Sequence, residues 1–74
     1  MLPAPSLRRI REQRFITQEE LAQQTQVSRA TISRIERGEP ARLTTLRKLA
    51  QVLGIQPADL TAVEPSDEGQ REAA

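Results

Sequence analysis

The sequence predicts a single all-α domain of five short helices within its 74 residues. One aromatic residue, Phe15, and no alternating run of β-branched residues leave strands without support. Apolar residues instead recur three and four positions apart, as they do on one face of a helix. Residues that begin and end helices stand between these periodic segments, so the helices can be placed one by one.

The first two helices are expected near the beginning of the chain. The first runs from about residue 5 or 6 to residue 13, with Leu7 and Ile10 on one face. The second follows the capping box Thr17-Gln18-Glu19-Glu20. Thr17 caps the helix and Glu20 reaches back to the Thr17 N–H. This helix should end near residue 24 or 25.

The third helix is expected over residues 29–36, because Ser28 is a good N-cap and Gly38 stands where a glycine ends a helix. Only about three residues separate it from the second helix, which allows the two to meet at a steep angle. The isoleucines of this helix should face the core. The residues on its outward face are then Arg29, Ala30, Ser33, Arg34 and Arg37. Such a face fits a grooved, negatively charged partner.

The last two helices close the expected domain. The fourth covers residues 43–53 and ends at Gly54, although Arg42 before it is a poor N-cap. The fifth is short and opens at Pro57. We expect residues 4–63 to form the folded domain. Residues 64–74 have no apolar face, so they should form a disordered acidic tail.

The charges are unevenly distributed, although the formal net charge is only +1. Residues 1–49 carry ten of the 11 basic residues and five acidic ones, whereas residues 50–74 carry one basic and five acidic residues. Ten of the basic residues are arginine, whose planar fork suits phosphates and guanine edges. A basic body with an acidic tail indicates a polyanionic partner. Charge alone is equally consistent with a solvated, salt-bridged helical surface.

The composition excludes several classes of function. The chain has no Cys and no His, so disulfides, the usual metal ligands and the commonest general base are missing. We therefore expect no catalytic residue, no metal site and no cofactor. RNA binding is disfavoured because Phe15 is the only aromatic residue available for stacking. Without a spanning apolar run or a secretion signal, we expect a soluble cytoplasmic protein.

The second and third expected helices carry a family resemblance. Residues 17–22 and 27–38 closely resemble the phage repressor/Cro-type (XRE-type) helix-turn-helix family, and residues 46–50 and 53–60 fit its last two helices. The resemblance spans about residues 6–61. It implies a compact five-helix bundle of the lambda-repressor-like DNA-binding type, in which the second and third helices form the helix-turn-helix. It also implies a bacterial or phage-encoded protein.

The resemblance also implies roles for individual residues. Contacts to base edges in the major groove would come from Arg29, Ala30 and Arg34. Contacts to phosphates would come from Thr17, Gln18, Ser28, Thr31, Arg37 and Arg42. Arg11 and Glu36 would form a structural ion pair, whose loss costs about 3 kcal/mol if it is well buried. Gln26 departs from the family, which usually has glycine there, and a positive φ at Gln26 would cost on the order of 1 kcal/mol.

The implied function is sequence-specific binding of double-stranded DNA by a homodimer on a two-fold operator, because one recognition helix covers few base pairs. Repressor, restriction-modification controller, antitoxin with a toxin partner and excised DNA-binding domain all stay open. Dimer contacts are expected at Ile55, Pro57, Leu60 and Val63, which fit an ordinary core equally well. The alternative function is a coactivator-like protein-interaction module of the same fold that hardly reads DNA.

Overall fold

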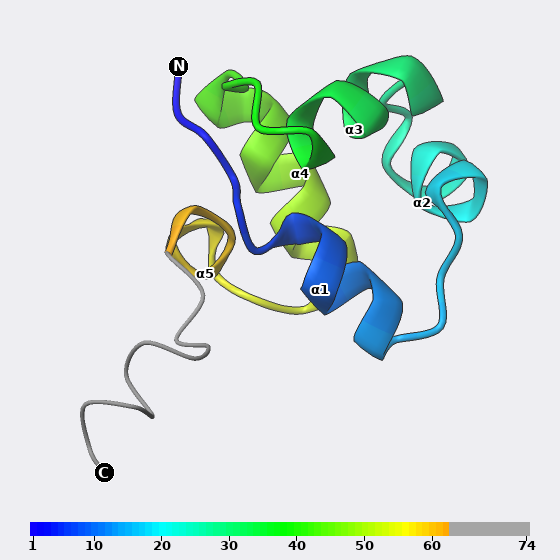
Figure 1. Ribbon diagram of the computed structural model, residues 1–74. Coiled ribbons are helices and arrows are strands. Elements are labelled where there is room, and N and C mark those ends of the chain that lie inside the picture. The colour runs from blue at the N-terminus through cyan, green and yellow to red at the C-terminus, as the bar shows by residue number, and fades with distance from the viewer. Residues whose placement is uncertain (63–74) are drawn as a thin grey trace, which may run out of the picture.

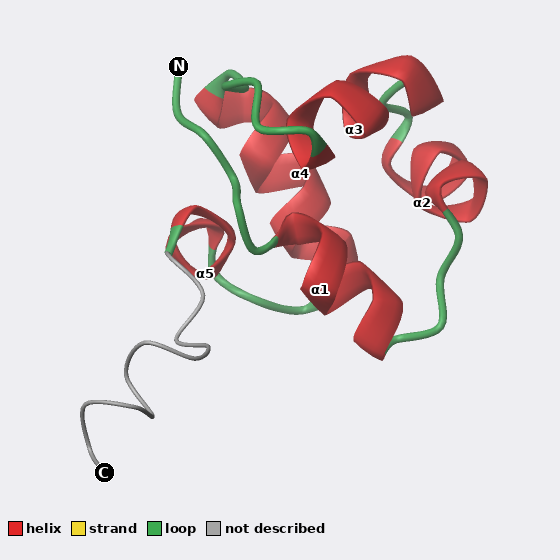
Figure 2. Cartoon of the chain, in the orientation of Figure 1, coloured by secondary structure: helices red, strands yellow, loops and turns green. Residues whose placement is uncertain are grey.

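The computed structural model describes residues 1–62 and contains five α-helices over that range. In chain order they are α1 (Leu7–Gln13), α2 (Gln18–Thr25), α3 (Arg29–Glu36), α4 (Leu43–Leu53) and α5 (Pro57–Thr61) (Figures 1 and 2). The predicted all-α fold is confirmed, and α3 and α4 have the predicted bounds. Val63 and the tail over residues 64–74 lie outside the described residues.

The core is aliphatic and is shared by all five helices. Helix α4 packs against both α2 and α5, while α1 packs against α3 and α5. The largest apolar side chains that are fully buried are Leu7, Leu21, Ile32, Ile35, Leu46, Leu49 and Leu60. Each buried side chain of this kind contributes about 1.5–3 kcal/mol relative to an exposed one. Because α3 supplies two of them, its inward face is fixed and its opposite face points to solvent.

Two of the expected caps are formed by side chains. The Thr17 hydroxyl accepts a hydrogen bond from the Glu20 N–H at 3.0 Å, and the Glu20 carboxylate accepts one from the Thr17 N–H at 2.9 Å. The Ser28 hydroxyl accepts one from the Thr31 N–H at 3.1 Å. Each cap of this type stabilises a helix by about 1 kcal/mol. They fix the beginnings of α2 and α3, the two helices of the helix-turn-helix.

The turn between α2 and α3 forces a left-handed backbone on Gln26, whose φ is 60° and ψ is 28°. Buried groups on either side hold the turn in place. The Thr25 hydroxyl donates to the Leu21 carbonyl at 2.7 Å and accepts from the Val27 N–H at 3.2 Å. Val27 itself belongs to the core. The residues on either side therefore determine the backbone conformation of Gln26, and the chain keeps a strain that glycine at this position would avoid.

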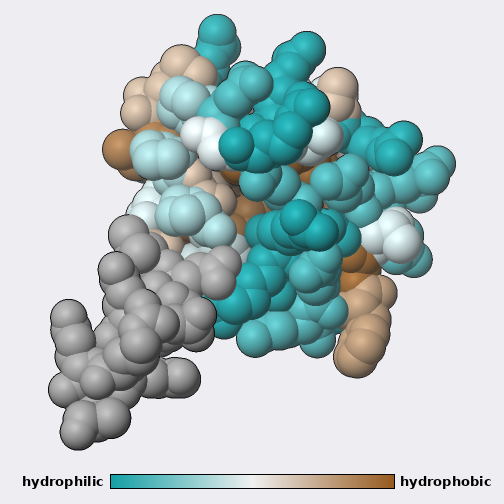
Figure 3. All heavy atoms as spheres, viewed as in Figure 1, coloured by the Kyte–Doolittle hydropathy of each residue, from teal (hydrophilic) through white to brown (hydrophobic). Residues whose placement is uncertain are grey.

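A second left-handed residue, Phe15, ends α1 with φ of 56°. The Phe15 N–H donates to the Glu12 carbonyl at 3.0 Å and the Ile16 N–H donates to the Arg11 carbonyl at 3.3 Å. This is the Schellman pattern, in which glycine usually occupies the position of Phe15. The ring is 93% exposed, and Figure 3 shows apolar surface beside the connector between α1 and α2. The Phe15 side chain therefore adds little packing to the fold, and its positive φ is a strained backbone conformation.

Replacing Gln26 with glycine should raise the free energy of unfolding by about 0.5–1 kcal/mol. The left-handed backbone costs an L-residue about 1–2 kcal/mol, and the greater freedom of glycine in the unfolded chain removes part of the gain. Urea denaturation measures the difference. Gln26→Ala is the control, because it keeps Cβ and therefore the strain. A glycine variant no more stable than the alanine variant would contradict this account of the turn.

Candidate nucleic-acid interface

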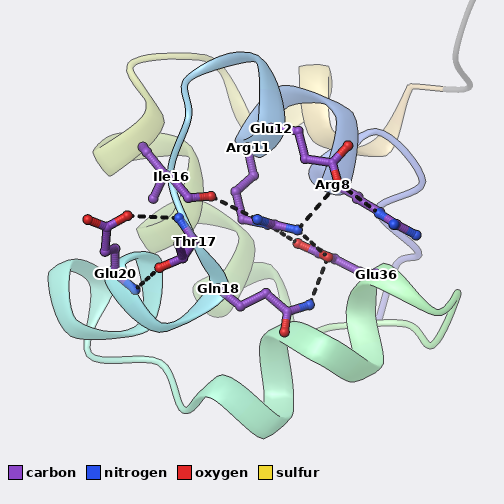
Figure 4. A network of polar contacts seen from close by, with 8 residues as sticks. All are labelled: Arg8, Arg11, Glu12, Ile16, Thr17, Gln18, Glu20 and Glu36. Atoms are coloured by element: carbon purple, nitrogen blue, oxygen red, sulfur yellow. Dashed lines mark hydrogen bonds and ion pairs between the residues drawn. The ribbon is translucent and has the colours of Figure 1, made fainter.

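A buried arginine connects the helices beneath the exposed face of α3 (Figure 4). Arg11 of α1 donates from Nε to Glu36 Oε2 at 2.6 Å and from Nη2 to Glu36 Oε1 at 3.1 Å. Its Nη1 donates to the Ile16 carbonyl at 2.8 Å. The side chains of Arg11 and Glu36 are 11% and 4% exposed. The hydrogen bond to Glu36 raises the pKa of Arg11 above its ordinary value and outweighs the lowering by burial. The guanidinium therefore stays charged at any physiological pH.

The same carboxylate binds α2 as well. Gln18, the first residue of α2, donates from Nε2 to Glu36 Oε1 at 2.9 Å. Glu36 is the last residue of α3, so one side chain joins three helices. Gln18 was expected to contact phosphate, and the structure shows that one of its amide donors binds Glu36 instead of facing solvent. We call Arg11, Gln18 and Glu36 the carboxylate hub.

Helix α3 turns a basic face to solvent. Arg29, Ala30 and Arg34 are exposed, whereas Ile32 and Ile35 are buried in the core. Arg37 lies exposed at the C-terminal end of the same helix. The hub holds the end of α3, and the cap at Ser28 holds its beginning. Three exposed arginines therefore stand on a helix that is fixed at both ends.

Hollows flank this face on both sides. On one side, a hollow between the N-termini of α2 and α3 is lined by Thr17, Gln18, Glu19 and Arg29 together with Arg11. On the other side, a larger hollow of about 430 Å³ lies between α3 and the α3–α4 loop. Its walls include Thr31, Arg34, Arg42 and Thr45, with Met1 at the rim. The residues expected to read bases thus lie between two groups expected to hold phosphates.

A family model described as Helix-turn-helix matches residues 7–60. The chain belongs to the repressor/Cro-type helix-turn-helix family. As a helix-turn-helix protein it has a transcription-regulator type of function and binds double-stranded DNA, and the family is not typically enzymatic. No curated protein and no solved structure matches the chain significantly.

The four residues expected at a dimer contact of this helix-turn-helix protein differ in their burial within the chain, and the contact itself stays a prediction. Leu60 is fully buried in the core, so it has no surface to offer a second copy. Its side chain completes the contact of α5 with the rest of the bundle, the alternative that its sequence context left open. Ile55 and Pro57 are half-buried and keep some exposed surface.

Within residues 1–62, no group of three acidic side chains comes together that could hold a metal ion. No helix in the same range is long and apolar enough to cross a membrane.

No sequence pattern predicted that the first residues of the chain contribute to this face. Met1 lines the hollow beside Arg34 and Arg42, and Leu2 pairs with Ala41 in an antiparallel bridge. These contacts join residues about 40 positions apart, so no periodic pattern or cap reports them. The nearest signal is a pair of prolines at positions 3 and 5, which favour an extended chain before α1.

Replacing Glu36 with alanine should lower the free energy of unfolding by about 3 kcal/mol, because Arg11 keeps its charge and loses its carboxylate partner inside the protein. Thermal and urea denaturation measure the loss. Glu39→Ala is the matched control, since Glu39 is an exposed glutamate in the following loop. That control should stay within about 0.5 kcal/mol of the wild type. Similar small losses in both variants would show that the hub does not stabilise the fold.

Proposed function

We propose that this helix-turn-helix protein is a sequence-specific transcriptional regulator that binds a two-fold operator as a homodimer. The observation that supports it most directly is the placement of Arg29 and Arg34. Both are exposed on a helix held at each end, with the hydroxyl of Thr17 on one side and Thr31, Thr45 and Arg42 on the other. A fixed helix with outward arginines suits the major groove, which admits one α-helix.

In this proposal α3 is the recognition helix. Arg29 and Arg34 each present a planar fork that matches the O6 and N7 acceptors of guanine. Ala30 lies between them on the exposed face, and its methyl group is short enough for close approach and contact with a thymine methyl. A good bidentate contact discriminates against the wrong base by about 1–3 kcal/mol.

Phosphate contacts would set the register of α3 in the groove. Thr17 and Gln18 stand at the N-terminus of α2, where free N–H groups and the helix dipole attract anions. On the other side of α3 the proposed contacts are Ser28, Thr31, Arg37 and Arg42. Such contacts carry affinity and salt dependence but no sequence information.

A homodimer follows from the small size of the reading face. One recognition helix contacts only a few base pairs, and two-fold binding at half-sites about 34 Å apart doubles the sequence read. We place the dimer contact around Ile55, in the connection between α4 and α5, and Pro57, the first residue of α5. Helix α5 lies on the other side of the bundle from α3 (Figure 1). A repressor, a restriction-modification controller and an antitoxin that also binds a toxin are all regulators of this design.

The test is selection of bound duplexes from a random DNA pool near physiological salt, followed by sequencing of the recovered DNA. We expect an enriched two-fold motif with its halves one helical turn apart. Salt-sensitive binding without any motif would contradict sequence-specific regulation. It would favour a protein-interaction module whose basic surface binds DNA without reading it.

Replacing Arg34 with alanine should cost about 1–3 kcal/mol of binding free energy on the selected operator and relax the preference at one base position in each half-site. The reason is that Arg34 is proposed to contact a base edge. Repeating the selection with the variant, and measuring its affinity for operator and scrambled duplexes, checks both effects. Equal losses on every duplex would assign Arg34 to the phosphate backbone instead.

Replacing Arg42 with alanine should weaken binding to operator and scrambled duplexes by the same factor, because Arg42 is proposed to contact only phosphate. The slope of log affinity against log salt should become shallower by about 1. Salt titrations on both duplexes measure these quantities. A loss confined to the operator would show that Arg42 takes part in sequence reading.

A further inference from the structure

The segment before α1 is joined to the loop that follows α3. The Leu2 N–H donates to the Ala41 carbonyl at 2.8 Å, and the Ala41 N–H donates to the Leu2 carbonyl at 2.7 Å. Ala41 lies between Pro40 and Arg42 in the α3–α4 loop. In Figure 1 the N-terminus lies near the beginning of α4, and the chain runs from there to the beginning of α1.

The other end of this segment is fixed to α5 and the core. Ala4 is buried in the core. The Ser6 hydroxyl donates to the Ala62 carbonyl at 2.6 Å, and the Ser6 N–H donates to the Leu60 carbonyl at 3.3 Å. Prolines at positions 3 and 5 restrict the residues before them, Leu2 and Ala4, to extended conformations. Residues 5 and 6 form the turn that leads into α1. We call residues 1–6 the strap, and hydrogen bonds hold it at both ends.

The strap holds the part of the loop that α3 does not hold. The first half of the loop stays bonded to α3, since the Gly38 and Glu39 N–H groups donate to the Ile35 and Arg34 carbonyls. The second half depends on Ala41, whose N–H and carbonyl both pair with Leu2. Arg42 comes next and is the N-cap residue of α4, but its side chain forms no capping hydrogen bond. The backbone of Arg42 is therefore held on two sides, by the Leu46 N–H that donates to its carbonyl at 3.0 Å and by the pairing of Ala41 with Leu2 before it.

We propose that Leu2 is a positioning residue of the DNA interface. By pairing with Ala41, it fixes Arg42 and the outer wall of the hollow beside Arg34, so that Arg42 reaches a phosphate from a constant place. Met1 contributes to the rim of the same hollow. The inference rests on the proposed phosphate contact of Arg42, and it adds that the strap is part of the binding machinery.

The test compares Leu2→Pro with Leu2→Ala on operator and scrambled duplexes. Proline removes the N–H that binds Ala41, whereas alanine keeps both backbone hydrogen bonds and removes only the side chain. We expect Leu2→Pro to weaken binding to both duplexes about fivefold, the size of one net hydrogen bond, and to reduce the salt slope. Leu2→Ala should lose much less affinity than Leu2→Pro, because both backbone hydrogen bonds to Ala41 remain.

A double variant separates positioning from general damage to the fold. If Leu2 acts through Arg42, then Leu2→Pro should cause almost no further loss of affinity in an Arg42→Ala background. A merely structural role would give losses that multiply, and such losses would overturn the proposal. Equal affinities of Leu2→Pro and Leu2→Ala would overturn it as well.

Urea denaturation of each variant shows whether it is folded under the binding conditions. If Leu2→Pro is not folded there, a chain shortened by residues 1 and 2 replaces it, because the shortening removes both hydrogen bonds without adding a proline ring. The same losses are expected of it. DNA affinity that depends on Arg42 but not on the Leu2 pairing overturns the role of the strap alone. A wild-type protein without DNA affinity overturns the proposed function as well.

Discussion

The carboxylate of Glu36 accepts hydrogen bonds from Arg11 of α1 and Gln18 of α2 while it belongs to α3. Desolvating two charges opposes much of the Coulombic attraction between them, so a buried pair of this kind contributes little net stability compared with a well-packed apolar pair. Its effect is geometric. The bidentate fork accepts one arrangement of α1 and α3, and the amide of Gln18 adds the beginning of α2. The exposed arginines of α3 take their direction from this hub.

The position of α2 also depends on two residues with an unfavourable backbone. Phe15 lies before the helix and Gln26 directly after it, and both have positive φ without being glycine. Each costs about 1–2 kcal/mol, a sizeable fraction of the stability of a small domain. The buried side chains of α2 and the turn after it offset this cost. The fold therefore maintains the position of α2 and the turn to α3 against local backbone preference.

Local signals in the sequence were enough for the helices but not for the contacts between distant segments. The bounds of α3 and α4 follow from caps, glycines and apolar spacing, all of which act within a few residues. The pairing of Leu2 with Ala41 and the bond from Gln18 to Glu36 depend on how the helices cross, which periodicity does not report. The sequence pattern could not assign Leu60 either, because an apolar residue near the end of a domain has the same spacing whether it belongs to the core or to an interface. The left-handed Phe15 carried no glycine or asparagine signal.

The side chains on the exposed face of α3 contribute little to the stability of the fold. Within the described residues, the side chains of Arg29, Ala30 and Arg34 are exposed and form none of the hydrogen bonds or ion pairs that hold the helices together. Substitutions at such positions usually change stability by less than about 0.5 kcal/mol. New binding preferences can therefore evolve here, or be engineered by exchanging a few side chains, while the hub beneath them stays unchanged. The scaffold and the exposed face of α3 can therefore vary independently of each other.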